Sequence, residues 1–190
     1  MNVDYCVSEI RKISKAMFDK NFFGIYHGSI SAKIDHNQFI INRKDAILDE
    51  LGLEDMVLLY SKKDYRWNEA SFDTATHLNI YKNIPEAKYV CYAMPPYLTA
   101  YSLEHVNLEP KDYFSSIKFD NIFIYDPKEF DDWAERAPSE ICRYMIEKNT
   151  NVVVVKGCGV YLYERTAYEI AKTVALLENS CKLLELAGKF

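Results

Sequence analysis

The segment Tyr-Val-Cys-Tyr-Ala at positions 89–93 is followed, after one methionine, by the consecutive prolines Pro95 and Pro96. A short run of apolar and aromatic residues is typical of a β-strand. Proline has no backbone N–H and cannot continue a sheet ladder, so the pair ends the strand at this point. Residues 88–93 are therefore predicted to form a strand, and residues 97–103 are predicted to begin a helix.

The other predicted elements alternate in type along the chain. Helices are predicted where apolar residues recur every three or four positions, and strands where short β-branched or alternating runs lie between turn residues. These criteria give helices at 3–20, 74–82, 130–148 and 166–186, strands at 29–34, 38–41, 56–60, 121–125, 151–156 and 160–163, and a short helical or turn segment at 48–53. Because the two types interleave without a linker or repeat, residues 1–190 are predicted to form a single α/β domain.

Two local patterns give more specific predictions. The strand at 151–156 contains four consecutive valines, and such a continuous apolar run predicts a central strand that is covered on both faces. Gly24, Gly28, Gly157 and Gly159 are predicted to lie at tight corners, where a positive φ is readily available to glycine.

Composition limits the classes of function. A formal net charge of -5 argues against nucleic-acid binding. No apolar run approaches the roughly 20 residues of a membrane span, and the N-terminal segment is amphipathic and has no signal-peptide core, so we expect a cytoplasmic protein that does not bind membranes. The five cysteines have no paired short spacing, which argues against a disulfide framework, and Cys6, Cys142 and Cys181 are expected to be buried. The 15 tyrosines suggest a subunit interface.

Four segments in order resemble the class II aldolase/adducin family: 22–34, like its glycine-rich opening; 39–58, like its hairpin arm and next strand; 73–97, like Glu-x-x-x-His-x-x-Ile-Tyr followed by a strand and His-x-His-Pro-Pro-Tyr; and 152–184, like a strand, Asn-His-Gly, a strand and a long helix. The resemblance implies a central, mainly antiparallel β-sheet flanked by helices. It also implies a homo-oligomer, commonly a tetramer with active sites between subunits.

The resemblance places the family's three zinc-binding histidines at Tyr92, Met94 and Cys158. A catalytic zinc needs about three protein ligands and an open position for substrate. A phenol, a thioether and one thiol do not supply that set, so no metal cofactor is expected, and zinc is conceivable only in a site rebuilt around Cys158. Cys91 cannot join such a site because neighbouring strand residues point to opposite faces.

The resemblance also places the family's catalytic glutamate at Asp73, and a helix histidine at His77. A carboxylate with a raised pKa can act as acid and base. The alternative interpretation, which we favour, is that Asp73 caps the helix that begins at residue 74, with Ser71 as another possible cap. His77 lies four positions after Asp73 and can face it, although we expect a structural hydrogen bond rather than a catalytic pair.

The family's phosphate-binding loops correspond to Gly28 and Ser29, to Arg43 and Lys44, and to Ser71. The two basic side chains could bind a small anionic ligand through charge-assisted hydrogen bonds. The alternative is a solvated hairpin turn, and Phe72, an apolar residue where the family has a hydroxyl, counts against a retained anion site.

Two functional hypotheses from different classes follow. The first is a family member that lacks zinc-dependent aldolase activity and serves as an oligomeric binding or scaffold module, for which the adducin head is a precedent in the family. The second is a lyase that acts on a small phosphorylated sugar or aldehyde, with a modified or relocated metal site and Asp73 as acid and base. A nucleophilic role for Cys158 is a third hypothesis, but a structural thiol is the simpler interpretation.

Overall fold

A computed structural model describes residues 1–188. In chain order its elements are α1 (Val3–Asp19), β1 (Ser29–Lys33), β2 (Gln38–Asn42), β3 (Met56–Tyr60), the 3-10 helix η1 (Tyr65–Asn68), α2 (Thr74–Asn83), β4 (Tyr89–Ala93), α3 (Pro96–Glu104), β5 (Asn107–Leu108), α4 (Tyr113–Lys118), β6 (Ile122–Phe123), α5 (Trp133–Lys148), β7 (Val152–Val155), β8 (Gly159–Glu164) and α6 (Ala167–Ala187). The predicted interleaving of helices and strands is confirmed.

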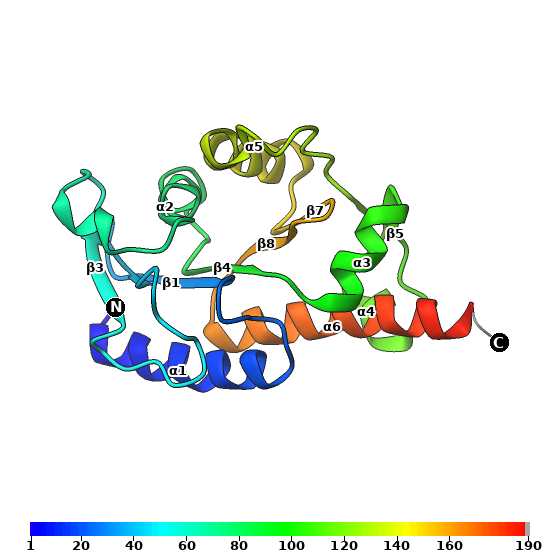
Figure 1. The fold of residues 1–190 in the computed structure, drawn as a ribbon, viewed down its shortest axis with the longest axis horizontal. Helices are drawn as coiled ribbons and strands as arrows, with labels where there is room; N and C mark the ends of the chain where they lie inside the picture. Colours follow the sequence, from blue (N-terminus) through cyan, green and yellow to red (C-terminus); the bar gives the residue numbers. More distant parts are fainter. Residues whose placement is uncertain (189–190) are drawn as a thin grey trace.

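A six-stranded sheet in the order β3-β2-β1-β4-β8-β7 forms the centre of the molecule. Every neighbouring pair in it is antiparallel. One face packs against α1 and α6 and the other against α2 and α5, while α3 and α4 lie towards one end (Figure 1). The predicted α/β fold with a central antiparallel sheet is confirmed.

Strand β4 lies inside this sheet, with β1 on one side and β8 on the other. Cys91 is fully buried on the α1 and α6 face, whereas Tyr92 packs on the α2 and α5 face. The strand ends before Pro95, whose neighbour Pro96 begins α3. The prediction that Cys91 and Tyr92 face opposite ways is therefore confirmed.

The prediction of a central position for the valine-rich strand is wrong. Strand β7 lies at the end of the sheet order, although all four of its valines are buried. Helices cover both of its faces, and Tyr125 forms a parallel bridge with Val155 at the open edge. An edge strand that is covered in this way has the same apolar pattern as a central strand, so composition alone did not distinguish them.

Two further predictions need correction. The strand predicted at 121–125 is reduced to β6, which pairs with the unpredicted β5 as a separate two-stranded sheet. The segment at 48–53, for which a helical or turn conformation was expected, forms turns and needs no correction. Gly28, Gly157 and Gly159 do adopt positive φ, but Gly24 does not; there, an added Cβ would lie 2.3 Å from the His27 ring, so close packing explains the glycine.

The cysteines are as predicted. Cys6, Cys142 and Cys181 are buried, and no disulfide is formed within residues 1–188. In the same part of the chain, no helix is both long and apolar enough to cross a bilayer.

Candidate functional site

A cleft of about 280 Å³ opens beside the end of the central sheet. Its walls come from the loop that precedes β1, from the segment after β2 and from the segment that enters α2. The lining residues are Gly24, Ile25, Tyr26, His27, Gly28, Asn42, Lys44, Ala46, Leu48, Ser71, Phe72, Asp73 and Tyr92. Four of the predicted site residues, Gly28, Lys44, Ser71 and Asp73, therefore meet in one cavity.

Asp73 lies at the N-terminus of α2, but its side chain forms no capping hydrogen bond with the helix. Instead, its Oδ1 accepts a hydrogen bond from the Tyr161 hydroxyl at 2.9 Å. Asp73 therefore occupies the N-cap position, as predicted, but the expected capping by its side chain is wrong. The start of α2 uses the Ser71 carbonyl, which accepts from the Thr74 N–H at 3.1 Å, and this leaves the Asp73 carboxyl free to face the cleft.

Burial raises the pKa of the Asp73 carboxyl, and hydrogen bonds from Tyr161 and Ser29 oppose that shift. Desolvation favours the uncharged form of an acid, whereas donors favour its carboxylate. A carboxyl group with a raised pKa in an open cleft has the properties needed to donate or accept a proton.

His77 lies beneath the cleft and is fully buried. Its Nε2 is 2.9 Å from Ser29 Oγ and its Nδ1 is 2.7 Å from Ser31 Oγ. Burial lowers the pKa of the imidazole to about 3, so the ring is neutral and one of its nitrogens donates while the other accepts. His77 thus makes structural hydrogen bonds, as expected, but to two serines of β1 rather than directly to Asp73.

The structure separates the residues predicted to bind an anion. Lys44 is exposed and lines the cleft. Arg43 does not line it, because its guanidinium pairs with Glu69 and donates to the Glu54 carbonyl. Ser29 is buried with His77 beneath the cavity. Of the five residues predicted to bind an anion, only Gly28, Lys44 and Ser71 line the cleft.

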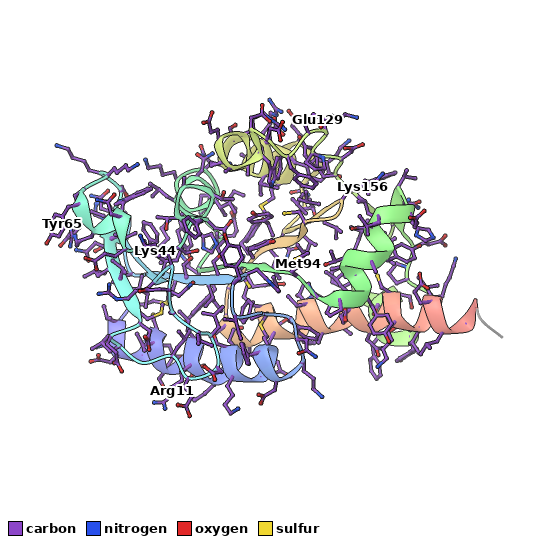
Figure 2. All side chains as sticks on the ribbon, viewed as in Figure 1. Arg11, Lys44, Tyr65, Met94, Glu129 and Lys156 are labelled. Carbon is purple, nitrogen blue, oxygen red and sulfur yellow. The ribbon has the colours of Figure 1, made fainter. Side chains whose placement is uncertain are left out.

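Of the three positions that resemble the family's zinc ligands, Tyr92 lines the cleft, whereas Met94 and Cys158 do not. The Tyr92 hydroxyl donates to the backbone carbonyl of Cys158 at 2.7 Å, and the Cys158 Sγ is 3.7 Å from the same hydroxyl. The Tyr92 ring stacks on Tyr161 with centroids 4.6 Å apart. Met94 follows β4, and Figure 2 shows it where the chain leads towards α3.

These side chains do not fit a zinc ion. Burial raises the pKa of the Tyr92 phenol and of the Cys158 thiol, which disfavours the anionic forms that bind metals. Met94 offers a thioether, which suits softer metals. Within residues 1–188, no cluster of three His, Cys, Asp or Glu side chains is arranged to hold a metal.

Sequence reasoning missed Tyr161 and the pair Ile25 and Tyr26. Tyr161 faces Tyr92 across the β4–β8 ladder, a register that the sequence does not specify. Asn42 ends β2, and its side-chain oxygen accepts from the Ile30 N–H at 2.8 Å. Two large apolar residues in a turn between Gly24 and His27 were a usable signal, since such positions favour small polar residues.

Comparisons with known proteins agree with this architecture. The sequence model of the class II aldolase and adducin N-terminal domain matches residues 8–184. No curated protein sequence matches the chain significantly.

Solved structures match the whole fold at low identity. L-fuculose-1-phosphate aldolase from Thermus thermophilus superposes with a TM-score of 0.85 at 18% identity, covering 97% of this chain and 94% of that one. A sugar-phosphate aldolase from Thermotoga maritima gives 0.78 at 14%, covering 98% and 96%. The N-terminal class II aldolase domain of a Thermoplasma acidophilum protein gives 0.67 at 11%, covering 97% and 95%. These matches establish a shared fold.

Proposed function

The chain belongs to the class II aldolase and adducin family, and from that premise we propose that it is a zinc-independent member that binds a small anionic molecule in its cleft. In this proposal it acts as an oligomeric binding or scaffold module and not as a zinc-dependent sugar-phosphate aldolase. The observation that carries the proposal is the direct contact between positions 92 and 158, through the Tyr92 hydroxyl and the Cys158 carbonyl.

That contact bears on chemistry because zinc-dependent cleavage relies on a Lewis acid that polarises the substrate carbonyl. A metal at this place would have to lie between Tyr92 and Cys158, where the Tyr92 hydroxyl instead bonds to the Cys158 backbone carbonyl. The phenol of Tyr92, at a position where the resemblance expects a histidine, donates its hydrogen bond to the Cys158 carbonyl. The ring of Tyr161 stacks against the same phenol. The donor set therefore supports loss of the metal-dependent step.

The cleft beside these residues remains open and supports a binding role. Among the described residues that line it, Lys44 is the only lysine or arginine. The carboxyl of Asp73 is biased by burial towards its uncharged form, so it opposes an anion less than an exposed aspartate does. Lys44, Ser71 and Gly28 could together contact a phosphate or carboxylate group.

Titration with methyl phosphate, followed by amide chemical shifts, tests this binding. We expect saturable shifts at the cleft residues, and about tenfold weaker binding for Lys44→Ala, because one charge-assisted hydrogen bond is lost. Lys62→Ala, which removes an exposed lysine outside the cleft, should bind like the wild type. Equal binding by the two variants would contradict a site at Lys44.

Oligomer formation is part of the proposal. Helix α4 carries the exposed apolar side chains Tyr113, Phe114 and Ile117, each about 70% exposed. Clustered apolar exposure of this kind is typical of interaction surfaces, and the family resemblance suggests a homotetramer. Light scattering coupled to size exclusion measures the mass directly, and a monomer at micromolar concentration would contradict this part.

A location in the cytoplasm is also proposed. The five cysteines are free although four of them are buried, which is compatible with a reducing compartment.

A second candidate function is a metal-independent lyase in which Asp73 transfers the proton. It is favoured by one observation, the raised pKa of a carboxyl group that lines an open cleft and is held by Tyr161. In this candidate, the Asp73 carboxylate would accept the proton of a substrate hydroxyl as the adjacent C–C bond breaks and releases the aldehyde. The electron pair of that bond would pass to the substrate ketone as an enolate, Asp73 would return the proton to the enolate carbon, and Lys44 would hold an anionic group. Release of an aldehyde from a phosphorylated sugar, lost in Asp73→Asn, would support it.

A further inference from the structure

Three large apolar residues that line the cleft are highly exposed, and we refer to them together as the apolar rim. Tyr26 is 89% exposed, Phe72 79% and Ile25 76%, and all three line the cavity that contains Lys44 and Asp73. Apolar side chains that are exposed together in this way are typical of surfaces that bind a ligand or a partner. The cleft thus presents two chemistries: the cationic and hydrogen-bonding side chains of Lys44 and Ser71, and the apolar rim.

The apolar residues stand on a turn with a defined shape. The Gly24 N–H donates to the His27 carbonyl at 2.9 Å, a bond that runs opposite to the one that closes a β-turn, and Ile25 and Tyr26 lie in the bend between these two residues. Such positions usually carry Gly, Pro, Asn, Asp or Ser. Two large apolar residues there contribute no visible packing to the core, since both are exposed.

The same loop is fixed at both ends. At its start, the Phe22 carbonyl accepts from the Met94 N–H at 2.9 Å, which ties the loop to the end of β4. At its end, Gly28 has a φ of +121° and packs so closely on Phe23 and Leu48 that a Cβ would meet them at 2.6 and 2.9 Å. The rim is therefore held in place before any ligand binds, and preorganisation of this kind favours affinity.

Phe72 completes the rim from the segment that enters α2. It lies between Ser71, which contributes to the anion-binding set, and Asp73, whose carboxyl is tied to Tyr161. The backbone on both sides of Phe72 is held by hydrogen bonds at the entry to α2. The Phe72 ring itself is exposed and lines the cleft instead of packing in the core.

From this arrangement we propose that the ligand of the cleft is an anion that carries an aromatic ring, with the anionic group at Lys44 and the ring against Tyr26 and Phe72. This inference rests on the proposed anion-binding function and adds the chemical class of the ligand. Aromatic side chains recognise flat rings by offset or edge-to-face packing, and a bare sugar phosphate offers no such surface to them.

Charge and size agree with this occupant. A cavity of about 280 Å³ lies just below the usual range for small-ligand sites, which begins at about 300 Å³. His27 lines it with a pKa that burial lowers, so it stays neutral and adds no competing charge. The occupant is therefore a single-ring compound rather than a dinucleotide or a peptide.

The test compares phenyl phosphate with methyl phosphate, and benzoate with acetate, by titration of the full-length protein. We expect the aryl member of at least one pair to bind about tenfold or more tightly than its partner, because burying part of a ring contributes roughly 25 cal/mol per Å². The pair that shows the preference tells whether the anion is a phosphate or a carboxylate. Tyr26→Ala and Phe72→Ala should each reduce the preference without weakening the methyl compound.

The matched control is Tyr65→Ala, which removes an equally exposed aromatic ring from η1, at one end of the molecule (Figure 2). It should keep the full aryl preference. Equal binding of aryl and methyl compounds would overturn the inference while leaving the anion site intact. Failure of all four compounds to bind would overturn both. A change in oligomeric mass in Phe72→Ala or Tyr26→Ala would also overturn it, because the rim would then be a contact between subunits.

Discussion

The Tyr92 hydroxyl lies 2.7 Å from the backbone carbonyl oxygen of Cys158 and donates a hydrogen bond to it. These residues come from β4 and from the turn before β8, two of the places where the family resemblance expects metal ligands. The Tyr92 side chain therefore links the two segments directly, at a place where the family resemblance expects a metal ion to do so. The same phenol stacks on Tyr161, which in turn holds Asp73, so the cluster is a connected part of the fold.

His77 should be important for stability. Replacement by Gln removes a ring that contacts Ser29 and Ser31 at the same time, and leaves at least one buried hydroxyl without its partner. We expect a loss of about 2 kcal/mol in the free energy of unfolding, measured by urea denaturation at pH 7.5. His36→Gln, which alters an exposed turn residue, should lie within about 0.5 kcal/mol of the wild type. A similar loss in both variants would contradict the assignment.

The contribution of His77 should depend on pH. Its pKa is about 3 in the folded protein and about 6.5 in an unfolded chain. Between these values the unfolded state binds more protons, so stability due to the neutral ring is complete above about pH 6.5 and is lost as the pH falls towards 3. The stability gap between wild type and His77→Gln should therefore shrink by about 2 kcal/mol from pH 7.5 to pH 5. A constant gap would show that the ring does not titrate as described.

The contribution of Asp73 to stability should depend on pH in the opposite direction to that of His77, and decrease as the pH rises. Its pKa is raised in the folded protein, so the folded state holds the proton more tightly and stability decreases as the pH rises above about 3.8, the ordinary pKa of the group. Asp73→Asn can keep the bond from Tyr161 without a charge, and should gain stability relative to wild type between pH 4 and pH 8. Urea midpoints at the two pH values measure this. Asp131→Asn, at an exposed position, should show no such trend.

Gly159 should tolerate no side chain. Its φ is +117°, and an added Cβ would lie 2.3 Å from the Ala93 carbonyl oxygen, where β8 begins to pair with β4. Gly159→Ala should cost more than about 2 kcal/mol, because it combines backbone strain with a steric clash. Gly188→Ala, where the nearest atom is 3.6 Å away, should be nearly neutral. Thermal midpoints compare the two, and equal shifts would contradict the close packing of β4 and β8.

Much of the fold could be predicted from local signals. The Pro95-Pro96 pair fixes the end of β4, and helical spacing gave α1 and α6 to within one residue at each end. The two-residue strand β5 was missed and β6 was predicted too long, because neither has enough length for a periodic pattern. The edge position of β7 was missed because burial by helices produces the same valine run as burial within a sheet.

The candidate site was less predictable because it depends on side-chain direction. The sequence indicated Asp73 as a helix cap, a local role that is common for aspartate. Its actual partner, Tyr161, is 88 positions away and is brought close by the pairing of β4 with β8. Likewise, Arg43 and Lys44 are adjacent in sequence, but only Lys44 lines the cleft, since Glu69 engages Arg43. Contacts between residues far apart in the sequence therefore decide which basic side chains can contact a ligand in the cleft.

The most direct test of the account is the metal content of the purified, tag-free protein after dialysis against zinc-supplemented buffer and then against metal-free buffer. The account predicts far less than one zinc per chain, because a donating phenol, a thioether and a protonated thiol replace the expected ligands. Cys158→Ala and the control Cys91→Ala, which removes a thiol on the opposite face of the sheet, should give the same low value. Near-stoichiometric zinc that is lost in Cys158→Ala and kept in Cys91→Ala would contradict the account and establish a rebuilt metal site.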